Sequence, residues 1–130
     1  MTRGAPAPAE LVALAERLLR RADPATAGLW PRATALLALS ALEAGVERLW
    51  QTNALALSGC SMRTQLICLR SYLADAALAA RAAHTWSALR RACHHHAYEL
   101  APTSVELESW LAVVAELSRA AEAAPRLSVP

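Results

Sequence analysis

The sequence predicts a small, single-domain, all-α protein, and composition and residue pattern both support this. More than half of the 130 residues are hydrophobic, but Phe is absent and the hydrophobic fraction is mostly Ala and Leu, which rank highest in helix propensity. β-Branched residues are few, and no useful stretch alternates between apolar and polar residues as a half-buried strand would. A chain of this length forms one modest core. We expect an antiparallel, up-down four-helix bundle with room for a short additional helix at the N-terminus.

The expected organisation is one helical domain over residues 8–124 between two short tails. Residues 1–7 are rich in Ala and Pro and are predicted to be disordered, as is the segment 125–130. Pro8 suits the first turn of a helix over 8–22 because its missing N–H would have no intrahelical partner there. The apolar face of this first helix contains Leu11, Val12, Leu14, Ala15, Leu18 and Leu19.

The second predicted helix spans 31–56 and opens at Pro31. Gly45 lies inside it and costs about 1 kcal/mol relative to Ala, unless another helix packs close there. The residues that recur at helical spacing are Leu36, Leu37, Ser40, Leu42, Val46, Leu49 and Trp50. We interpret the four tryptophans of the chain as core or dimer-interface anchors.

The third helical region runs over 62–94, with Ser61 as its predicted cap. The sequence leaves open whether it is one long helix or two that join near Asp75. Thr103 and Glu106 form a capping-box pattern before a last helix over 104–123. The predicted inward positions of that helix are Val105, Leu107, Trp110, Leu111, Val114 and Leu117.

Charge and cysteine content exclude several classes of protein. The net charge of +2 is far from the strongly basic surface of a stable nucleic-acid binder, although all basic residues are Arg, which can clamp phosphate. The cysteines at positions 60, 68 and 93 form no CxxC, so neither a disulfide framework nor a zinc ribbon is indicated. No signal peptide or membrane-spanning stretch is evident, so we expect a cytoplasmic protein with no membrane partner.

The segment that carries chemistry is a pair of arginines, Arg90 and Arg91, followed by His94, His95 and His96. The simplest interpretation is helix termination, because cationic side chains stabilise a helix C-terminus. A metal site is a second interpretation, but adjacent side chains on a helix diverge by about 100° and cannot all face one ion. The third is RNA cleavage without metal, in which histidines transfer protons and an arginine stabilises the phosphorane.

Arg91, His96 and Tyr98 fit the pattern Arg-x4-His-x-Tyr. This resembles the motif of the HEPN (higher eukaryote and prokaryote nucleotide-binding) superfamily, and most closely that of HEPN toxins encoded beside a nucleotidyltransferase antitoxin. The position is similar too, because the family places the motif at the end of an inner helix, before a loop and a final amphipathic helix.

The resemblance implies a four-helix bundle that forms a homodimer, with a composite endoribonuclease site at the interface that needs no metal or cofactor. The substrate would be tRNA or another RNA in a toxin, stress or phage-defence setting. Arg91 and His96 would be catalytic, with His95 in support. Further support would come from Arg90, His94 and His84. The partner nucleotidyltransferase would attach AMP to Tyr98.

Other interpretations stay open. Arg90 with His95 gives a second register, which we disfavour because it places Ala97 at the tyrosine position. Ala92 follows the motif arginine where the family often has Asn, Asp or His. The alternative function is a catalytically silent helical module that binds a protein or nucleotide, and the third is a small metal-binding helical protein.

Overall fold

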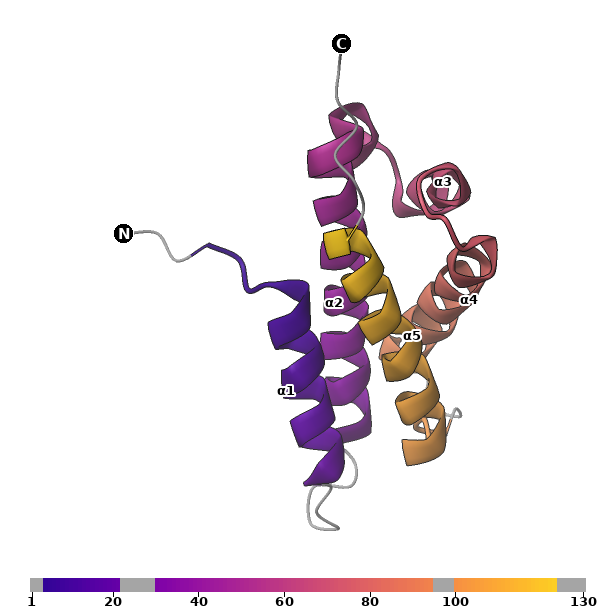
Figure 1. Ribbon diagram of the computed structural model, residues 1–130. Helices are drawn as coiled ribbons and strands as arrows, with labels where there is room; N and C mark the ends of the chain where they lie inside the picture. Colours follow the sequence, from indigo (N-terminus) through magenta and orange to yellow (C-terminus); the bar gives the residue numbers. More distant parts are fainter. Residues whose placement is uncertain (1–3, 22–29, 95–99, 124–130) are drawn as a thin grey trace.

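The computed structural model describes residues 4–21, 30–94 and 100–123, and regular structure there is entirely helical (Figure 1). The predicted all-α class is therefore confirmed. The predicted tails fall largely outside these ranges, and residues 4–7 precede the first helix without regular structure. The elements are α1 (Pro8–Arg20), α2 (Trp30–Asn53), α3 (Met62–Cys68), α4 (Ala76–Cys93) and α5 (Ser104–Ala123), with 3-10 turns at Leu55–Gly59 and Leu69–Ser71.

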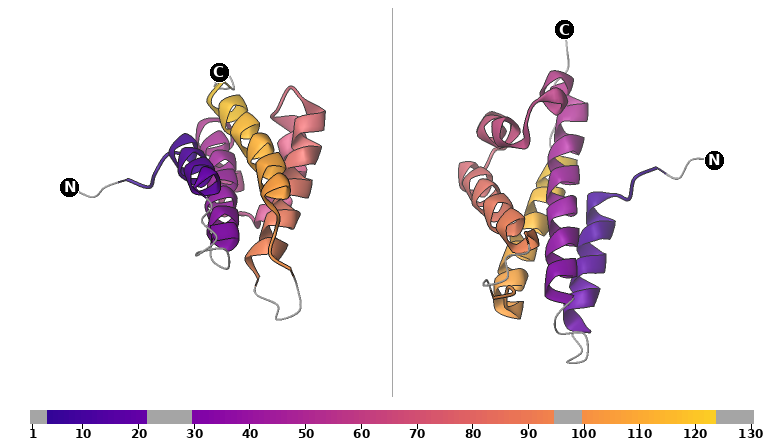
Figure 2. Two further views of the ribbon diagram at one scale, coloured as in Figure 1. Left: turned by 90° about the horizontal axis from the view of Figure 1, so that it is seen from below. Right: turned by 180° about the vertical axis from the view of Figure 1, so that it is seen from behind.

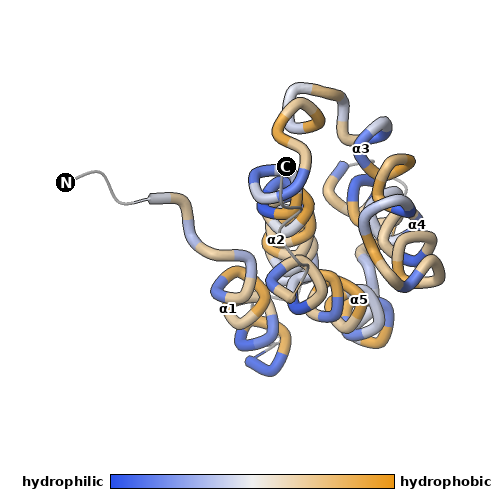
Figure 3. The backbone as a smooth tube through the Cα atoms, turned by 45° about the horizontal axis from the view of Figure 1, so that its top comes forward, coloured by the Kyte–Doolittle hydropathy of each residue, from blue (hydrophilic) through white to orange (hydrophobic). Residues whose placement is uncertain are grey.

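Helix α2 is the centre of the arrangement. It packs against α1, α5 and α4, while α1 and α5 also touch each other (Figures 1 and 2). The short helix α3 lies outside this group, beside α4. Hydrophilic and hydrophobic residues alternate along each helix in Figure 3, as expected for helices that bury one face. None of the helices in the described ranges is long and apolar enough to cross a membrane.

The predicted helix starts agree with the capping contacts. Helix α1 begins at Pro8. The hydroxyl of Ser61 accepts a hydrogen bond from the backbone N–H of Thr64 at 3.3 Å. At the start of α5, the N–H of Glu106 donates to the Thr103 hydroxyl at 3.1 Å, and the N–H of Thr103 donates to the Glu106 carboxylate at 3.2 Å. The reciprocal pair is the capping box that the sequence predicted.

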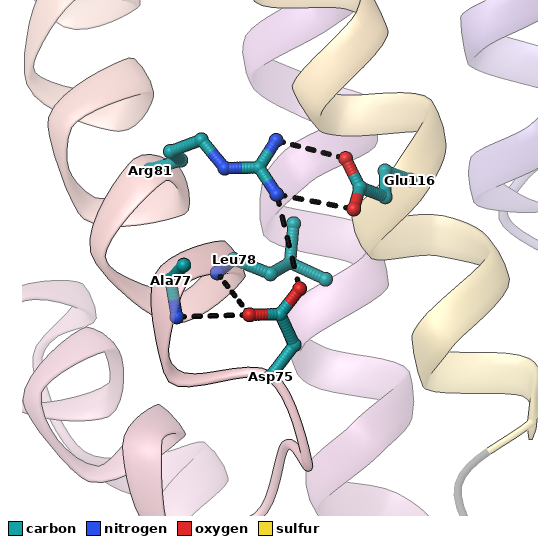
Figure 4. A network of polar contacts seen from close by, with 5 residues as sticks. All are labelled: Asp75, Ala77, Leu78, Arg81 and Glu116. Atoms are coloured by element: carbon teal, nitrogen blue, oxygen red, sulfur yellow. Dashed lines mark hydrogen bonds and ion pairs between the residues drawn. The ribbon is translucent and has the colours of Figure 1, made fainter.

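The region 62–94 forms two helices, which settles the question that the sequence left open. Asp75 is the N-cap of α4, and its carboxylate accepts from the N–H groups of Ala77 and Leu78 at 2.9 and 3.1 Å (Figure 4). One turn on, the Arg81 guanidinium makes a two-pronged contact to Glu116 of α5 at 2.9 and 3.1 Å. This hydrogen bonding lowers the pKa of Glu116, so the stabilisation is present at neutral pH and is lost as pH falls through the lowered pKa.

The core contains most of the predicted inward residues, but three predictions were wrong. Leu14, Leu36 and Val105 are 41%, 56% and 71% exposed. Leu36 was predicted inward because it is large, but the buried face of α2 consists largely of small residues, including Ala35 and Ala38. The large apolar side chains therefore did not mark the buried face correctly. The largest fully buried side chains include Trp50, Leu42, Leu49, Leu69, Leu89, Leu107 and Leu117.

Gly45 has a packing reason for its place inside α2. A Cβ built at this position would lie 4.0 Å from the Cα of Ser118 on α5. The two helices therefore approach closely there, as expected for a glycine inside a helix. That distance is ordinary van der Waals contact, so the glycine allows the approach without being required for it.

Candidate functional site

The candidate site lies where α4 ends and α5 begins. Arg91 is in the last turn of α4, and His94 follows the helix as its C-cap, with its N–H donating to the Arg91 carbonyl at 3.2 Å. His95, His96 and Tyr98 lie outside the described residues, and their roles stay predictions. From Leu100 onward the connector leads into α5 through the capping box.

Arg91 lines a cavity of about 270 Å³ between the end of α4 and the start of α5. Its other walls come from the connector and from the first two turns of α5, including Pro102, Glu106 and Trp110. The cavity is thus lined by an arginine, a glutamate and a tryptophan from two helices that a 10-residue connector separates in sequence. Of these three residues, only Arg91 was predicted from the sequence as part of a site.

The Arg91 guanidinium is exposed and forms no salt bridge with any residue of the described ranges. Glu106, the carboxylate in the same cavity, accepts hydrogen bonds from the N–H and hydroxyl of Thr103 and so serves the cap of α5. Since no carboxylate of these ranges pairs with it, the fork of Arg91 donors faces no described acceptor, and phosphate is an anion that fits such a fork.

Arg90 is placed differently, although it is the neighbour of Arg91 in sequence. Its guanidinium carbon lies 4.9 Å from the centre of the Trp86 ring, a cation–π contact. The indole N–H of Trp86 donates in turn to Glu43 at 3.2 Å. Arg90 does not line the cavity of Arg91. The register of Arg91 with His96 therefore has its arginine at a cavity, whereas the register of Arg90 with His95 has its arginine against Trp86.

The structure adds Arg32, which sequence reasoning missed. This residue lies in the first turn of α2, and its Nη1 donates to the backbone carbonyl of His94 at 3.4 Å. A second guanidinium thus stands at the end of α4. The signal that could have found it is topological, because α2 and α4 are antiparallel neighbours and the start of one lies beside the end of the other.

The remaining candidates are less closely grouped. His84 is exposed on α4, about 10 Å along the axis from Arg91, and does not line the same cavity. The His94 side chain is exposed as well. Burial, with a smaller effect from the Glu43 carboxylate, raises the pKa of the Cys93 thiol and favours its neutral form.

The metal interpretation gains no support from the part of the chain that the structure covers. No group of three His, Cys, Asp or Glu side chains there could hold an ion. His95 and His96, which that interpretation needs, are outside this part.

Comparisons of the chain with protein-family models, with curated proteins and with solved structures give no match.

Proposed function

We propose that this protein is a metal-independent endoribonuclease of the HEPN type, acting in the cytoplasm as a toxin or as a stress or phage-defence factor. One observation carries the proposal. The arginine of the Arg-x4-His-x-Tyr motif, Arg91, stands in the last turn of α4, beside a cavity and without a salt bridge to any residue of the ranges 4–21, 30–94 and 100–123. The all-helical fold is compatible with a HEPN-like bundle, and that finer assignment is part of the proposal.

The chemistry would be attack of a 2′-hydroxyl on the neighbouring phosphorus of RNA. A base removes the hydroxyl proton, an acid protonates the leaving 5′-oxygen, and a cation stabilises the phosphorane. Histidine suits both proton transfers because its pKa is near neutrality. We assign His96 to proton transfer with His95 in support, and Arg91 to the phosphorane. No metal or cofactor takes part in this scheme.

The partners in this proposal are RNA, a second copy of the chain and a nucleotidyltransferase that attaches AMP to Tyr98. Residues five apart on a regular helix diverge by about 140°, so Arg91 and His96 converge only if the helix ends between them, as α4 does at Cys93, or if a partner completes the site. A second copy would supply the missing half. Apolar side chains near the cavity support such an interface, since Leu100 is 97% and Val105 is 71% exposed.

Cleavage of a mixture of tRNAs tests the proposal. We expect cleavage to persist in excess EDTA and to leave a 2′,3′-cyclic phosphate. His96→Ala should lower the rate about 10²- to 10⁴-fold, the usual effect of removing a general acid or base. Arg91→Lys should also lower it strongly because a point charge cannot replace a bidentate fork.

His94→Ala is the matched control and should keep most of the activity. Equal losses from His94→Ala, His95→Ala and His96→Ala, with rescue by zinc, would instead support the metal-binding alternative. Absence of cleavage in a wild-type dimer that still binds its partner would contradict the ribonuclease and support the silent interaction module.

A further inference from the structure

A second cavity, larger than the one beside Arg91, lies between α3 and α4. Its volume is about 630 Å³, and none of its lining residues belongs to the candidate site. One wall is α3 and the turn that follows it, with Arg63, Ile67 and Arg70. The other wall is α4. Ile67 is 69% exposed although it is one of the most hydrophobic side chains of the chain.

The wall formed by α4 contains Trp86 and a row of small residues. Ala76, Ala80, Ala83 and Ser87 all line the cavity and follow one another at intervals of four, three and four residues. This spacing keeps them on one face of the helix for three turns, or about 16 Å. Small side chains allow a second helix to approach closely, and α3, with seven residues, is too short to cover the row.

The cavity is bordered by positive charge. Arg63 and Arg70 line it, and Arg90 continues the row on α4, three residues after Ser87. No carboxylate lines it, and none of these three arginines forms a salt bridge within the described parts of the chain. An occupant that is apolar along its centre and acidic at its edges would therefore complement both features.

We propose that the α3–α4 groove binds an amphipathic helix of another protein, with its apolar face on the alanine row and Asp or Glu side chains against Arg63, Arg70 and Arg90. This does not depend on the ribonuclease proposal. RNA fits the groove less well, because most of its lining is apolar. Its one aromatic lining residue, Trp86, is 7% exposed and offers no open face for a base.

A displayed library of 18-residue helical peptides tests the proposal against the full-length protein. One face of each peptide carries Ala, Leu, Ile or Met, and the flanking positions are randomised among Glu, Lys and Gln. We expect selection to enrich Glu over Lys at the flanks. Enrichment of Lys, or no enriched peptide at all, would overturn the proposal.

Variants then locate the bound peptide, with the affinity of one enriched, fluorescein-labelled peptide measured by anisotropy. Ala80 is exposed, so Ala80→Trp fills the groove without disturbing the core. This variant and the double variant Arg63→Glu/Arg70→Glu should each weaken binding at least tenfold. The matched controls on exposed positions of α2 and α1 are Ala33→Trp and Arg17→Glu/Arg20→Glu, which should bind as wild type.

Three results would contradict this assignment. The first is an equal loss of peptide binding in the controls. The second is tighter binding of a 12-nucleotide oligouridine, lost in Arg63→Glu/Arg70→Glu but not in Ala80→Trp, which would make the surface a nucleic-acid contact. The third is a concentration-dependent dimer that Ala80→Trp dissociates, which would make the groove an interface between copies of this chain.

Discussion

At the scale of single residues, the best-defined polar contact in the core joins Trp50 and Gln65. Both are buried, and the indole N–H donates to the Gln65 side-chain oxygen at 2.8 Å. The Gln65 amide nitrogen donates to the Cys60 carbonyl at 2.8 Å, so one side chain satisfies two groups. Tyr72 packs edge-on against Trp50 with ring centres 5.1 Å apart. This cluster attaches α3 to the end of α2.

We expect Gln65→Leu to lower the free energy of unfolding by about 1–3 kcal/mol, because a buried indole N–H and a carbonyl lose their partner. Denaturation by urea measures this change in the free energy of unfolding. The double variant Gln65→Leu/Trp50→Phe is the control and should cost less than the sum of the two single variants, since it removes donor and acceptor together. A loss below about 0.5 kcal/mol for Gln65→Leu would show that water satisfies the indole.

At the scale of elements, close packing of α2 against α5 depends on small residues. Gly45 faces the backbone of Ser118, and the buried face of α2 also contains Ala35, Ala38 and Ala41. Alanines fill little volume, so the helix axes approach until backbone and side chain touch. Because this small-residue face is the buried one, Leu36 lies on the exposed side of α2.

Gly45→Ala should stabilise the protein by about 0.5–1 kcal/mol, because a methyl group fits at this spacing and the helix loses a flexible residue. Thermal unfolding should show an increase in Tm of a few degrees. Gly45→Leu is the opposing variant, and we expect it to destabilise the chain because its side chain meets the α5 backbone. Destabilisation by Gly45→Ala would mean that the added Cβ lies closer than 4.0 Å to the Cα of Ser118.

At the scale of the whole molecule, two surfaces remain available for assembly. One is the end of α4 with the start of α5, where Leu100 lines the Arg91 cavity and Val105 lies in the first turn of α5, both of them exposed. The other is the α3–α4 groove. They involve different residues, so one chain has room for a second copy at one surface and a partner helix at the other.

We expect a two-fold dimer through the first surface, with twice the 13.9 kDa mass of one chain in light scattering. The double variant Leu100→Glu/Val105→Glu should dissociate it, because charges replace apolar contacts at the interface. Leu36→Glu changes a similarly exposed leucine on α2 and should stay dimeric. A monomeric wild type that retains ribonuclease activity would refute the composite site.

Helix positions were predictable from the sequence because the interactions that start and stop a helix are local. Pro8, Ser61 and the Thr103–Glu106 box act within about one turn, and each functions in the structure as predicted. The Arg-x4-His-x-Tyr pattern is likewise a property of one segment, and its function stays a prediction. The role of Asp75 as a cap was not predicted, although the sequence placed a helix junction there.

The remaining features depend on residues far apart in the chain. The packing of the helices decides which face of α2 is buried and where the groove beside α4 lies. It also brings Arg32 to His94 and gives Arg90 and Arg91 different surroundings. Residue periodicity describes a helix face only relative to its own axis. The packing of several helices around α2, which excludes water between them, decides which residues a helix face contacts. It also decides whether an arginine lies beside a cavity or against an aromatic ring.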